Sequence, residues 1–298
     1  MLVTWKYRPR DTFLQRLDPR SRILYLACVT LAVTVSQVWD FRLLLPVCLI
    51  SLALYFTGRL PWKDVRRAWT LILLFITLIL GLNALLSGRG GPMAVLDEAQ
   101  QTIIYQSGAL VVPVTGWALR LTLTVERVWF AAAQMVRILS MVALAIPIPY
   151  TIDPSMYGVT FRRMGLPDKA AQTIDLAFRF VPTLGRDFAL TMDAQRARGY
   201  ELEQLRVGPI ERLRRLAPLI VPVVMSAIVS GEDVVDAMDL RAFGTRPRTW
   251  LRAGWLRFRP ADYALLGLGV ALMVGFVTIS LMGYGDFWVP EFMYRLFQ

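Results

Sequence analysis

The sequence predicts an all-α integral membrane protein with four N-terminal transmembrane helices, a cytoplasmic helical region and one C-terminal transmembrane helix. Hydrophobic residues make up 56% of the 298 positions and charged residues only 18%. An average soluble domain is about 45–50% apolar and about 25% charged. The mean hydropathy is correspondingly high, at +0.49. The formal net charge of +11 is typical of membrane proteins whose basic residues face anionic lipid on the cytoplasmic side.

Five apolar runs are candidates for the spans, and they divide the chain into three regions. About 20 apolar residues cross a hydrocarbon core as a helix. Residues 1–150 hold four runs, of which the second is the weakest, residues 261–298 hold the fifth, and residues 151–260 are more polar. The runs are Ile23–Trp39, Leu43–Thr57, Ala68–Ser87, Val128–Pro149 and Tyr263–Gly283.

The distribution of basic residues predicts the orientation of the spans. Lys and Arg are concentrated before the first run, after the second run and in residues 151–260, which hold seventeen of them against twelve Asp and Glu. Loop 88–122 has only Arg89 and Arg120. Because cytoplasmic loops are enriched in Lys and Arg, we expect the N-terminus and residues 151–260 to be cytoplasmic. Loop 88–122 and the C-terminus are then outside, and that loop suits either an amphipathic helix or short re-entrant pieces.

Several residue pairs and single residues mark helix boundaries. In Asp18-Pro19 and Asp153-Pro154 the carboxylate can cap a helix and the proline fits its first position. The helix after the second pair is expected to stop at Gly165, and Pro167 to open the next one. Apolar residues then recur every three or four positions from Ile174 to Met192. This pattern predicts an amphipathic helix and not a span.

The segment Leu216–Ser230 is apolar enough to suggest a sixth span, but we expect it to belong to a second long helix at the inner face. It is short, Pro218 and Pro222 interrupt it, and four acidic residues follow it before position 240. A span here would also place two similar motifs, described next, in different compartments. Whether the segment lies on the membrane or dips into it is left open by the sequence.

Two stretches, "DAQRARGY" from Asp193 and "DAMDLRAF" from Asp236, share the pattern Asp-Ala-x-x-x-Arg-small-aromatic. Alanine and arginine four residues apart share one helix face, as at Ala194 and Arg198 and at Ala237 and Arg241. Glycines nearby, Gly199 and Gly244, are expected to end the helices. A single arginine in a last turn is explained by the helix dipole. Two copies with matched flanks favour docking into grooves lined by carboxylates, which the arginine fork can bind bidentately.

No catalytic motif competes with this interpretation. The chain has no histidine, which excludes histidine-based catalysis and histidine metal sites, and it has neither a P-loop nor a G-x-S-x-G motif. Cys28 and Cys48 both fall in apolar runs and suit packing. Nucleic-acid binding is disfavoured because the basic residues flank apolar runs. Arg137 is a charge inside the fourth span and therefore a functional candidate, although pairing with Glu126 or with another chain explains it as well.

Four stretches in order resemble the transmembrane T component of energy-coupling factor (ECF) transporters, the vitamin and metal-ion importers of prokaryotes. They are "LQRLDPRSR", "RRMGLPDKAAQTIDLAFRFVPTL", "AQRARG" and "AMDLRAFGTRPRT". The last two are similar to the family's pair of Ala-Arg-Gly motifs. The second departs from the pattern because Ala242 and Phe243 separate Arg241 from Gly244, which puts its fine geometry in question but not its role.

The resemblance implies a prokaryotic inner or plasma membrane protein in which residues 151–260 form coupling helices. Its implied partners are membrane lipid, two ATP-binding cassette (ABC) ATPases and a substrate-binding S component, with no nucleic acid. ATP and Mg²⁺ would be bound by the ATPases, and this chain would bind no cofactor, hold no metal and catalyse no reaction. The substrate would be a vitamin or a transition-metal ion such as cobalt or nickel. The implied ATPase-docking residues are Ala194, Ala197, Arg198, Gly199, Ala237, Arg241, Ala242 and Gly244.

Two other classes of function are alternatives. A self-sufficient permease would bind solute among its own helices, but it would need polar residues in several spans, and Asn83, Gln134 and Arg137 are nearly all that the runs contain. A membrane-embedded enzyme acting on lipid would need a cluster of His, Asp or Cys at the interface, and the sequence suggests none.

Overall fold

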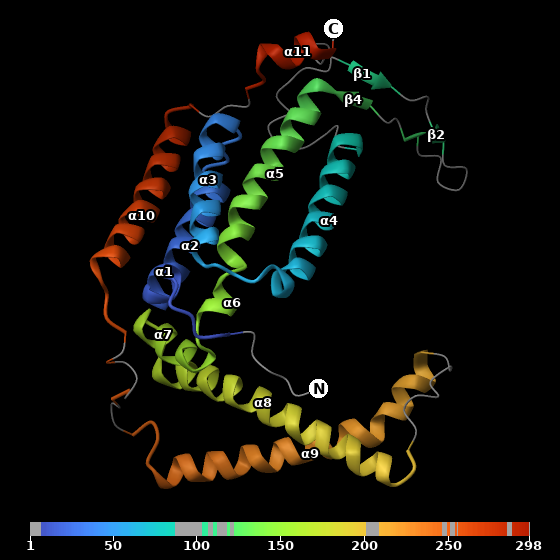
Figure 1. The fold of residues 1–298 in the computed structure, drawn as a ribbon, viewed down its shortest axis with the longest axis vertical. Coiled ribbons are helices and arrows are strands. Elements are labelled where there is room, and N and C mark those ends of the chain that lie inside the picture. The colour runs from blue at the N-terminus through green and yellow to red at the C-terminus, as the bar shows by residue number, and fades with distance from the viewer. Residues whose placement is uncertain are drawn as a thin grey trace. The chain divides into compact units, whose positions relative to one another are not determined.

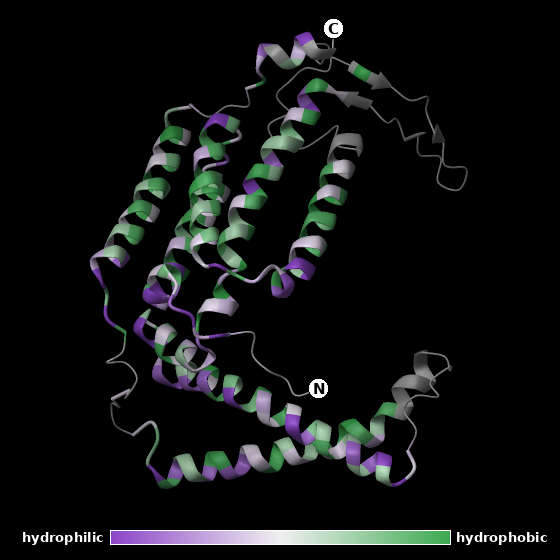
Figure 2. Ribbon diagram, viewed as in Figure 1, coloured by the Kyte–Doolittle hydropathy of each residue, from purple (hydrophilic) through white to green (hydrophobic). Residues whose placement is uncertain are grey.

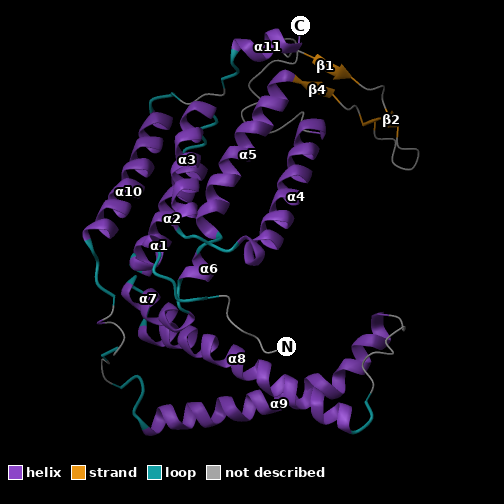
Figure 3. Ribbon diagram, in the orientation of Figure 1, coloured by secondary structure: helices purple, strands orange, loops and turns teal. Residues whose placement is uncertain are grey.

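The computed structural model describes residues 7–86, 103–106, 110–111, 118–119, 122–200, 209–245, 249–250, 254, 256–284 and 288–297. The chain divides into two compact units. The larger, which we call the bundle unit, comprises Arg8–Thr151 and Phe258–Gln298. The smaller, the motif unit, comprises Met1–Tyr7 and Ile152–Arg257. Helices make up nearly all of the described secondary structure (Figures 1 and 3).

The bundle unit is built from long apolar helices and a few short ones. Its long helices pack in pairs, α2 along α10, α3 along α5 and α4 against α5. α10 comes close to α2 at Gly269, where an added Cβ would lie 3.0 Å from the ring of Tyr25. The helices of the bundle unit are α1 (Phe13–Arg16), α2 (Pro19–Val35), α3 (Phe41–Thr57), α4 (Trp62–Leu86), α5 (Val125–Ala145), α6 (Ile148–Thr151), α10 (Pro260–Leu281) and α11 (Glu291–Phe297).

Three described helical segments are long and apolar enough to cross a membrane, namely Val125–Thr151, Leu216–Leu240 and Pro260–Leu281. The apolar helix Phe41–Thr57 is shorter. Figure 2 shows hydrophobic residues along most of the length of the helices in the bundle unit. Large side chains such as Phe75 and Leu78 of α4 are exposed there, as expected for surfaces that face lipid and not water. The molecule is therefore a membrane protein with several apolar helices of spanning length.

The first apolar run is shorter as a helix than the sequence suggested. α2 ends at Val35, Gln37 has a positive φ of 49°, and Asp40 caps the start of α3 by accepting a hydrogen bond from the Arg42 backbone N–H. Trp39 consequently lies in the connection between the two helices, where its ring packs against Phe130 with the ring centroids 4.8 Å apart. Trp39 therefore lies outside the helix and is held by aromatic packing.

The sequence left loop 88–122 open between an amphipathic helix and re-entrant pieces, and the described residues of the loop take neither form. They form antiparallel pairs of short strands, while the other described elements are helical, in agreement with the all-α class. Strand propensity explains this, because the paired residues include β-branched and aromatic ones, as in "IIYQ" and "TLT". Residues 87–102 lie outside the described residues. The strands are β1 (Ile103–Gln106) paired with β4 (Thr122–Thr124), and β2 (Leu110–Val111) paired with β3 (Ala118–Leu119).

A buried network of polar groups joins the start of α2 to the start of α10. As predicted, Asp18 caps α2, accepting from the backbone N–H of Arg20. Its carboxylate also binds the Arg20 guanidinium through two hydrogen bonds of 3.0 and 2.8 Å. Asp262 of α10 is fully buried and accepts three hydrogen bonds, from the Asp18 backbone N–H at 2.8 Å, the Ser21 hydroxyl at 2.7 Å and the Arg259 backbone N–H at 2.8 Å. Because both carboxylates accept several hydrogen bonds, their charges can be buried.

The same stretch of α2 also binds Thr151, the residue at which the chain leaves the bundle unit. Arg22 is buried, and its guanidinium donates to the Thr151 hydroxyl at 2.8 Å and to the Leu17 carbonyl at 3.1 Å. Thr151 is the last residue before the motif unit, and Phe258, which lies under the Arg20 guanidinium at 4.1 Å, is the first after it. The segment Asp18–Arg22, which we call the junction, therefore contacts both chain crossings within the bundle unit.

The motif unit contains η3 (Pro154–Met156), α7 (Tyr157–Arg163), α8 (Asp168–Ala197) and α9 (Pro209–Leu240). Three predicted boundaries are confirmed: Asp153 caps η3, Gly165 takes a positive φ of 107° after α7, and Pro167 precedes α8. The length argument against Leu216–Ser230 was wrong, because α9 continues through both prolines for 32 residues. Its placement relative to the membrane remains a proposal.

We predict that Asp262→Asn lowers the stability of the bundle unit. The amide group would turn a donor toward at least one of the three N–H and O–H donors, which costs about 1–3 kcal/mol for a buried group left without its partner. The measurement is the thermal unfolding midpoint of the purified protein in detergent. The control Ser21→Ala removes only one of the three donors to Asp262 and should shift the midpoint less. Equal midpoints for Asp262→Asn and the unmodified protein would contradict the assigned network.

Candidate functional site

The first arginine motif forms a complete helix-ending turn at the end of α8. Arg198 is the C-cap residue, and Gly199 follows it with a φ of 83°. The Gly199 N–H donates to the Arg196 carbonyl at 2.9 Å, and the Tyr200 N–H donates to the Gln195 carbonyl at 3.0 Å. This pair of bonds defines a Schellman motif, in which the left-handed residue reverses the chain and satisfies the last carbonyls. The prediction that Gly199 ends the helix is confirmed.

The second motif forms the same turn, but a different residue takes the left-handed position. Ala242 has a φ of 54°, its N–H donates to the Asp239 carbonyl at 2.8 Å, and the Phe243 N–H donates to the Met238 carbonyl at 3.0 Å. The prediction that Gly244 ends α9 was therefore wrong. Gly244 also has a positive φ, of 88°, but it lies two residues beyond the turn. Ala242 is the structural counterpart of Gly199.

The hydrogen-bond pattern aligns the two motifs residue by residue, so that Arg241 corresponds to Arg198 and Ala237 to Ala194. Ala197 has Leu240 as its counterpart, which is 90% exposed. Each arginine occupies the C-cap position of its helix, where a cation complements the helix dipole. All the residues predicted to form the site are exposed, namely Ala194, Ala197, Arg198, Gly199, Ala237, Arg241, Ala242 and Gly244. The exposed pattern suits contact with another molecule.

The two helix ends lie far apart within the motif unit. α8 and α9 run in opposite directions and contact each other, so their C-terminal ends fall at opposite ends of the pair (Figure 1). A hydrogen bond joins α8 to α9, in which the Gln195 Nε2 donates to the Pro218 carbonyl at 3.4 Å. Pro222 has no N–H, so the carbonyl four residues before it lacks its helical donor. The arrangement can serve two partners at once.

Trp250, ten residues after the end of α9, binds the start of α8 through one carboxylate. Asp168, the first residue of α8, accepts a hydrogen bond from the Trp250 Nε1 at 3.1 Å. It also forms an ion pair with the guanidinium of Arg162. Hydrogen bonds from Arg162 and Trp250 hold the pKa of Asp168 below its usual value. The sequence analysis did not identify these residues, although an acidic residue in a first helical turn is a recognised signal.

Comparison with known proteins matches residues 10–250 to the family CbiQ, described as cobalt transport protein. The matched range is most of the chain and contains both arginine motifs. The chain belongs to the CbiQ family.

Curated relatives of this CbiQ family member carry the name energy-coupling factor transporter transmembrane protein EcfT. The protein of Exiguobacterium sibiricum is 29% identical over 287 residues, covering 95% of this chain and 99% of the relative. That of Thermosediminibacter oceani is 28% identical over 277 residues, covering 91% and 94%. That of Thermotoga maritima is 26% identical over 285 residues, covering 91% and 92%. The predicted resemblance to the T component is confirmed.

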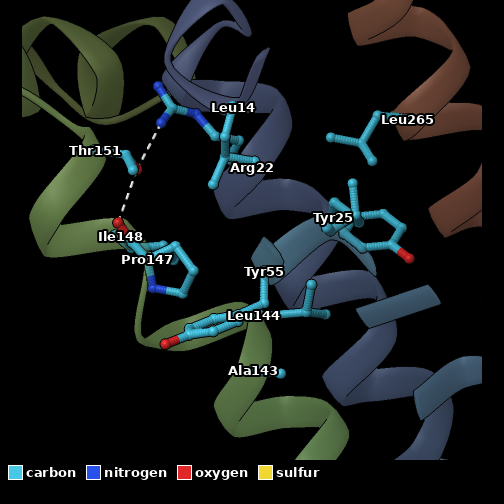
Figure 4. Close-up of a pocket in the computed structure, with 11 residues that line it drawn as sticks. Leu14, Arg22, Tyr25, Tyr55, Ala143, Leu144, Pro147, Ile148, Thr151 and Leu265 are labelled. Carbon is cyan, nitrogen blue, oxygen red and sulfur yellow. Dashed lines mark hydrogen bonds between the residues drawn. The ribbon is translucent and has the colours of Figure 1, made fainter. Parts of the chain in front are cut away.

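A pocket in the bundle unit of this CbiQ family member is lined mostly by apolar side chains. In Figure 4, Arg22 reaches the Thr151 hydroxyl, and the Tyr55 hydroxyl accepts a hydrogen bond from Trp69 at 2.8 Å. Among the lining residues, the buried Tyr25 hydroxyl has no hydrogen-bond partner within the described residues. Solute pockets need polar groups that converge on the ligand. Within the described residues, no three Cys, Asp or Glu side chains gather in a way that could hold a metal ion.

The intramembrane arginine does not pair with Glu126. Arg137 follows Glu126 by eleven positions in α5, which is about 16 Å along a helix. Its guanidinium instead lies over the Trp39 ring, 4.5 Å from the centroid, and the side chain is buried. A cation–π contact of this kind stabilises a desolvated guanidinium. The arginine therefore fixes the α2–α3 connection against α5.

We predict that reciprocal substitutions at the two turns of this CbiQ family member have opposite effects. Ala242→Gly should stabilise the end of α9, and Gly199→Ala should destabilise the end of α8, because a left-handed conformation costs an L-residue roughly 1–2 kcal/mol. Nothing lies within 4 Å of the Cβ added at Gly199, so this effect is conformational. Hydrogen exchange of the Phe243 and Tyr200 amides measures each turn. Slower exchange at both sites, or no change at either, would contradict the assigned turns.

Proposed function

We propose that the chain is the transmembrane scaffold and energy-coupling subunit of an ECF-type ABC importer. One ABC ATPase docks at Arg198 and a second at Arg241, and a substrate-binding S component lies beside the chain in the membrane. ATP-driven closure of the ATPases moves α8 and α9, and the S component then releases a vitamin or a transition-metal ion inward. ATP and Mg²⁺ belong to the ATPases, and this chain contributes no cofactor site.

The observation that carries this proposal is the duplicated arginine helix end. The same backbone turn, with arginine at the same position, is built at two distant ends of one helix pair. A helix cap alone needs no exposed cation, whereas an ATPase groove with acidic side chains needs a guanidinium that is held in a fixed direction. The Arg198 side chain is exposed and makes no hydrogen bond or ion pair with the residues that the structure describes, so it is available to such a partner.

The proposed topology has four N-terminal spans, a final span at α10 and a cytoplasmic motif unit. One end of the bundle unit is aromatic: Trp129 donates to the Trp288 carbonyl at 2.9 Å, and its ring lies 4.9 Å from that of Phe41. Tryptophan is enriched at both membrane interfaces, so this end lies at one of them, and the basic residues of the opposite end make it the outer one. The other end holds Arg20 and Arg22, as the positive-inside rule requires of the cytoplasmic side.

We place α9 on the cytoplasmic face despite its hydropathy. It contacts α8, which carries charged residues from Asp168 to Arg196 and cannot cross hydrocarbon. The two helices run in opposite directions, so a spanning α9 would carry Arg241 to the outside, away from the ATPases. The exposed apolar residues of α9, such as Val224 and Ile228, are then available to the membrane surface or to the S component.

We predict that the Arg198→Ala/Arg241→Ala double variant loses its ATPases while still inserting in the membrane. Loss of one partner from a desolvated charged contact costs about 2–5 kcal/mol, and each docking site supports the other through effective concentration. Each single variant should weaken assembly and uncouple uptake, and lysine should rescue poorly because it lacks the fork. Co-purification of the ATPases and substrate uptake in cells are the measurements.

Arg196→Ala is the matched control for the double variant. Arg196 is an exposed arginine of the same helix end, paired with Asp193 at 3.6 Å, and its loss should leave the ATPases bound. If the double variant retained its ATPases and transported normally, the two arginines would be helix caps only.

We predict that Arg66 faces the cytoplasm and Tyr284 the outside. Both side chains are exposed, so cysteines introduced there should be reachable in a background in which Cys28 and Cys48 are replaced by alanine. An impermeant thiol reagent added to intact cells should label position 284 and not position 66. The opposite pattern would invert the proposed topology.

A further inference from the structure

The two arginine motifs are held in the motif unit by different contacts. The first, in α8, is held by the hydrogen bond from Gln195 to Pro218 in α9. The second, at the end of α9, is followed nine residues later by Trp250, whose indole N–H donates to Asp168. The difference implies that one motif can be disturbed without the other.

We propose that Trp250 and Asp168 are positioning residues for the second motif, so that docking at Arg241 depends on their hydrogen bond and docking at Arg198 does not. This inference rests on the proposed function, because it assigns a determinant to one of its two docking sites. It gives a role to two residues that lie outside the arginine motifs. Neither Trp250 nor Asp168 takes part in the backbone hydrogen bonds of either turn.

The carboxylate of Asp168 joins three segments of the chain at one point. It begins α8, it binds Arg162 in the last turn of α7, and it accepts the indole N–H of Trp250 at 3.1 Å. Asp168 and Arg162 are both partly exposed, at 38% and 41% of their side chains, so the bond is strengthened by the charge of the acceptor and not by deep burial. Trp250 is thereby held at the α7–α8 corner.

A second contact places the chain just after Arg241 beside the same corner. A Cβ added to Gly244 would lie 3.6 Å from the Lys169 Cε, and Lys169 is the neighbour of Asp168 in the first turn of α8. The turn at Ala242 and Phe243 fixes the direction in which the chain leaves α9. Gly244 and Trp250, which both follow this turn, therefore contact neighbouring residues at the start of α8, Lys169 and Asp168.

The low pKa of Asp168 is consistent with a bond that persists in the cytoplasm. A carboxylate whose folded pKa lies below its unfolded value stabilises the fold above the unfolded pKa, near 4, and loses that contribution as the pH falls below it. The acceptor is therefore charged at neutral pH, and the Trp250 bond is a charge-assisted one.

The test is a comparison of cross-links from the two motifs in the complex with its ATPases. A photo-activated cross-linking residue is placed at Asp193 in one preparation and at Asp236 in another, since these are equivalent exposed positions one turn before each arginine. Trp250→Phe keeps the bulk of the ring and removes the N–H. It should lower the ATPase cross-link from position 236 by about threefold to tenfold, as expected for the net contribution of one hydrogen bond between partly exposed groups, and leave that from position 193 unchanged.

Trp69→Phe is the matched control, because Trp69 also donates its indole N–H, to the Tyr55 hydroxyl in the bundle unit. It should leave the ratio of the two cross-links unchanged. Asp168→Ala removes the same bond from the acceptor side and should reproduce the selective loss at position 236, which keeps the test decisive if Trp250→Phe does not fold. Equal changes at both positions, or none, in both variants would overturn the inference.

The two failures are distinguishable. If the unmodified chain yields no ATPase cross-link from either position, the docking proposal itself is wrong. If it yields both cross-links and neither Trp250→Phe nor Asp168→Ala alters their ratio, docking stands and the positioning role of Trp250 is wrong.

Discussion

The buried carboxylate of Asp262 and the junction Asp18–Arg22 set the constraint on which the bundle unit depends. The chain leaves this unit after Thr151 and returns at Phe258, with more than 100 residues between. Nothing in the covalent chain keeps those two points together. The junction does so by binding Thr151 through Arg22 and the start of α10 through Asp262. A single short segment near the N-terminus therefore completes a bundle whose last long helix is encoded far downstream.

Local sequence signals were enough to predict several helix boundaries and the turn of the first arginine motif. Asp18 and Asp153 cap helices because a carboxylate three atoms from its own backbone can reach the next N–H groups whatever the tertiary structure. Gly199 ends α8 for a similarly local reason, because glycine is the residue that adopts a left-handed conformation without strain. The membrane class followed from composition, which reflects the solvent around the protein more than its fold.

Features that depend on distant contacts or on unfavourable local conformations were not predictable in this way. No sequence signal marks Ala242 as left-handed, and the nearby Gly244 offered the more obvious end for α9. The Trp250–Asp168 bond joins residues 82 positions apart, beyond the reach of any periodicity. Pro218 suggested an interruption because isolated prolines break helices, but α9 continues through it.

The proline pair in α9 has a mechanical consequence for its contact with α8. Within the α-helical pattern only the carbonyl four residues before a proline lacks a donor, so Pro222 exposes the carbonyl of Pro218 and Gln195 binds it. Pro218 in turn leaves the carbonyl of Arg214 without its helical donor, one turn earlier in α9. A slide of one helix along the other by a single turn, about 5.4 Å, would therefore carry Gln195 from one free acceptor to the next. The proline pair thus gives the α8–α9 contact two equivalent positions one helical turn apart.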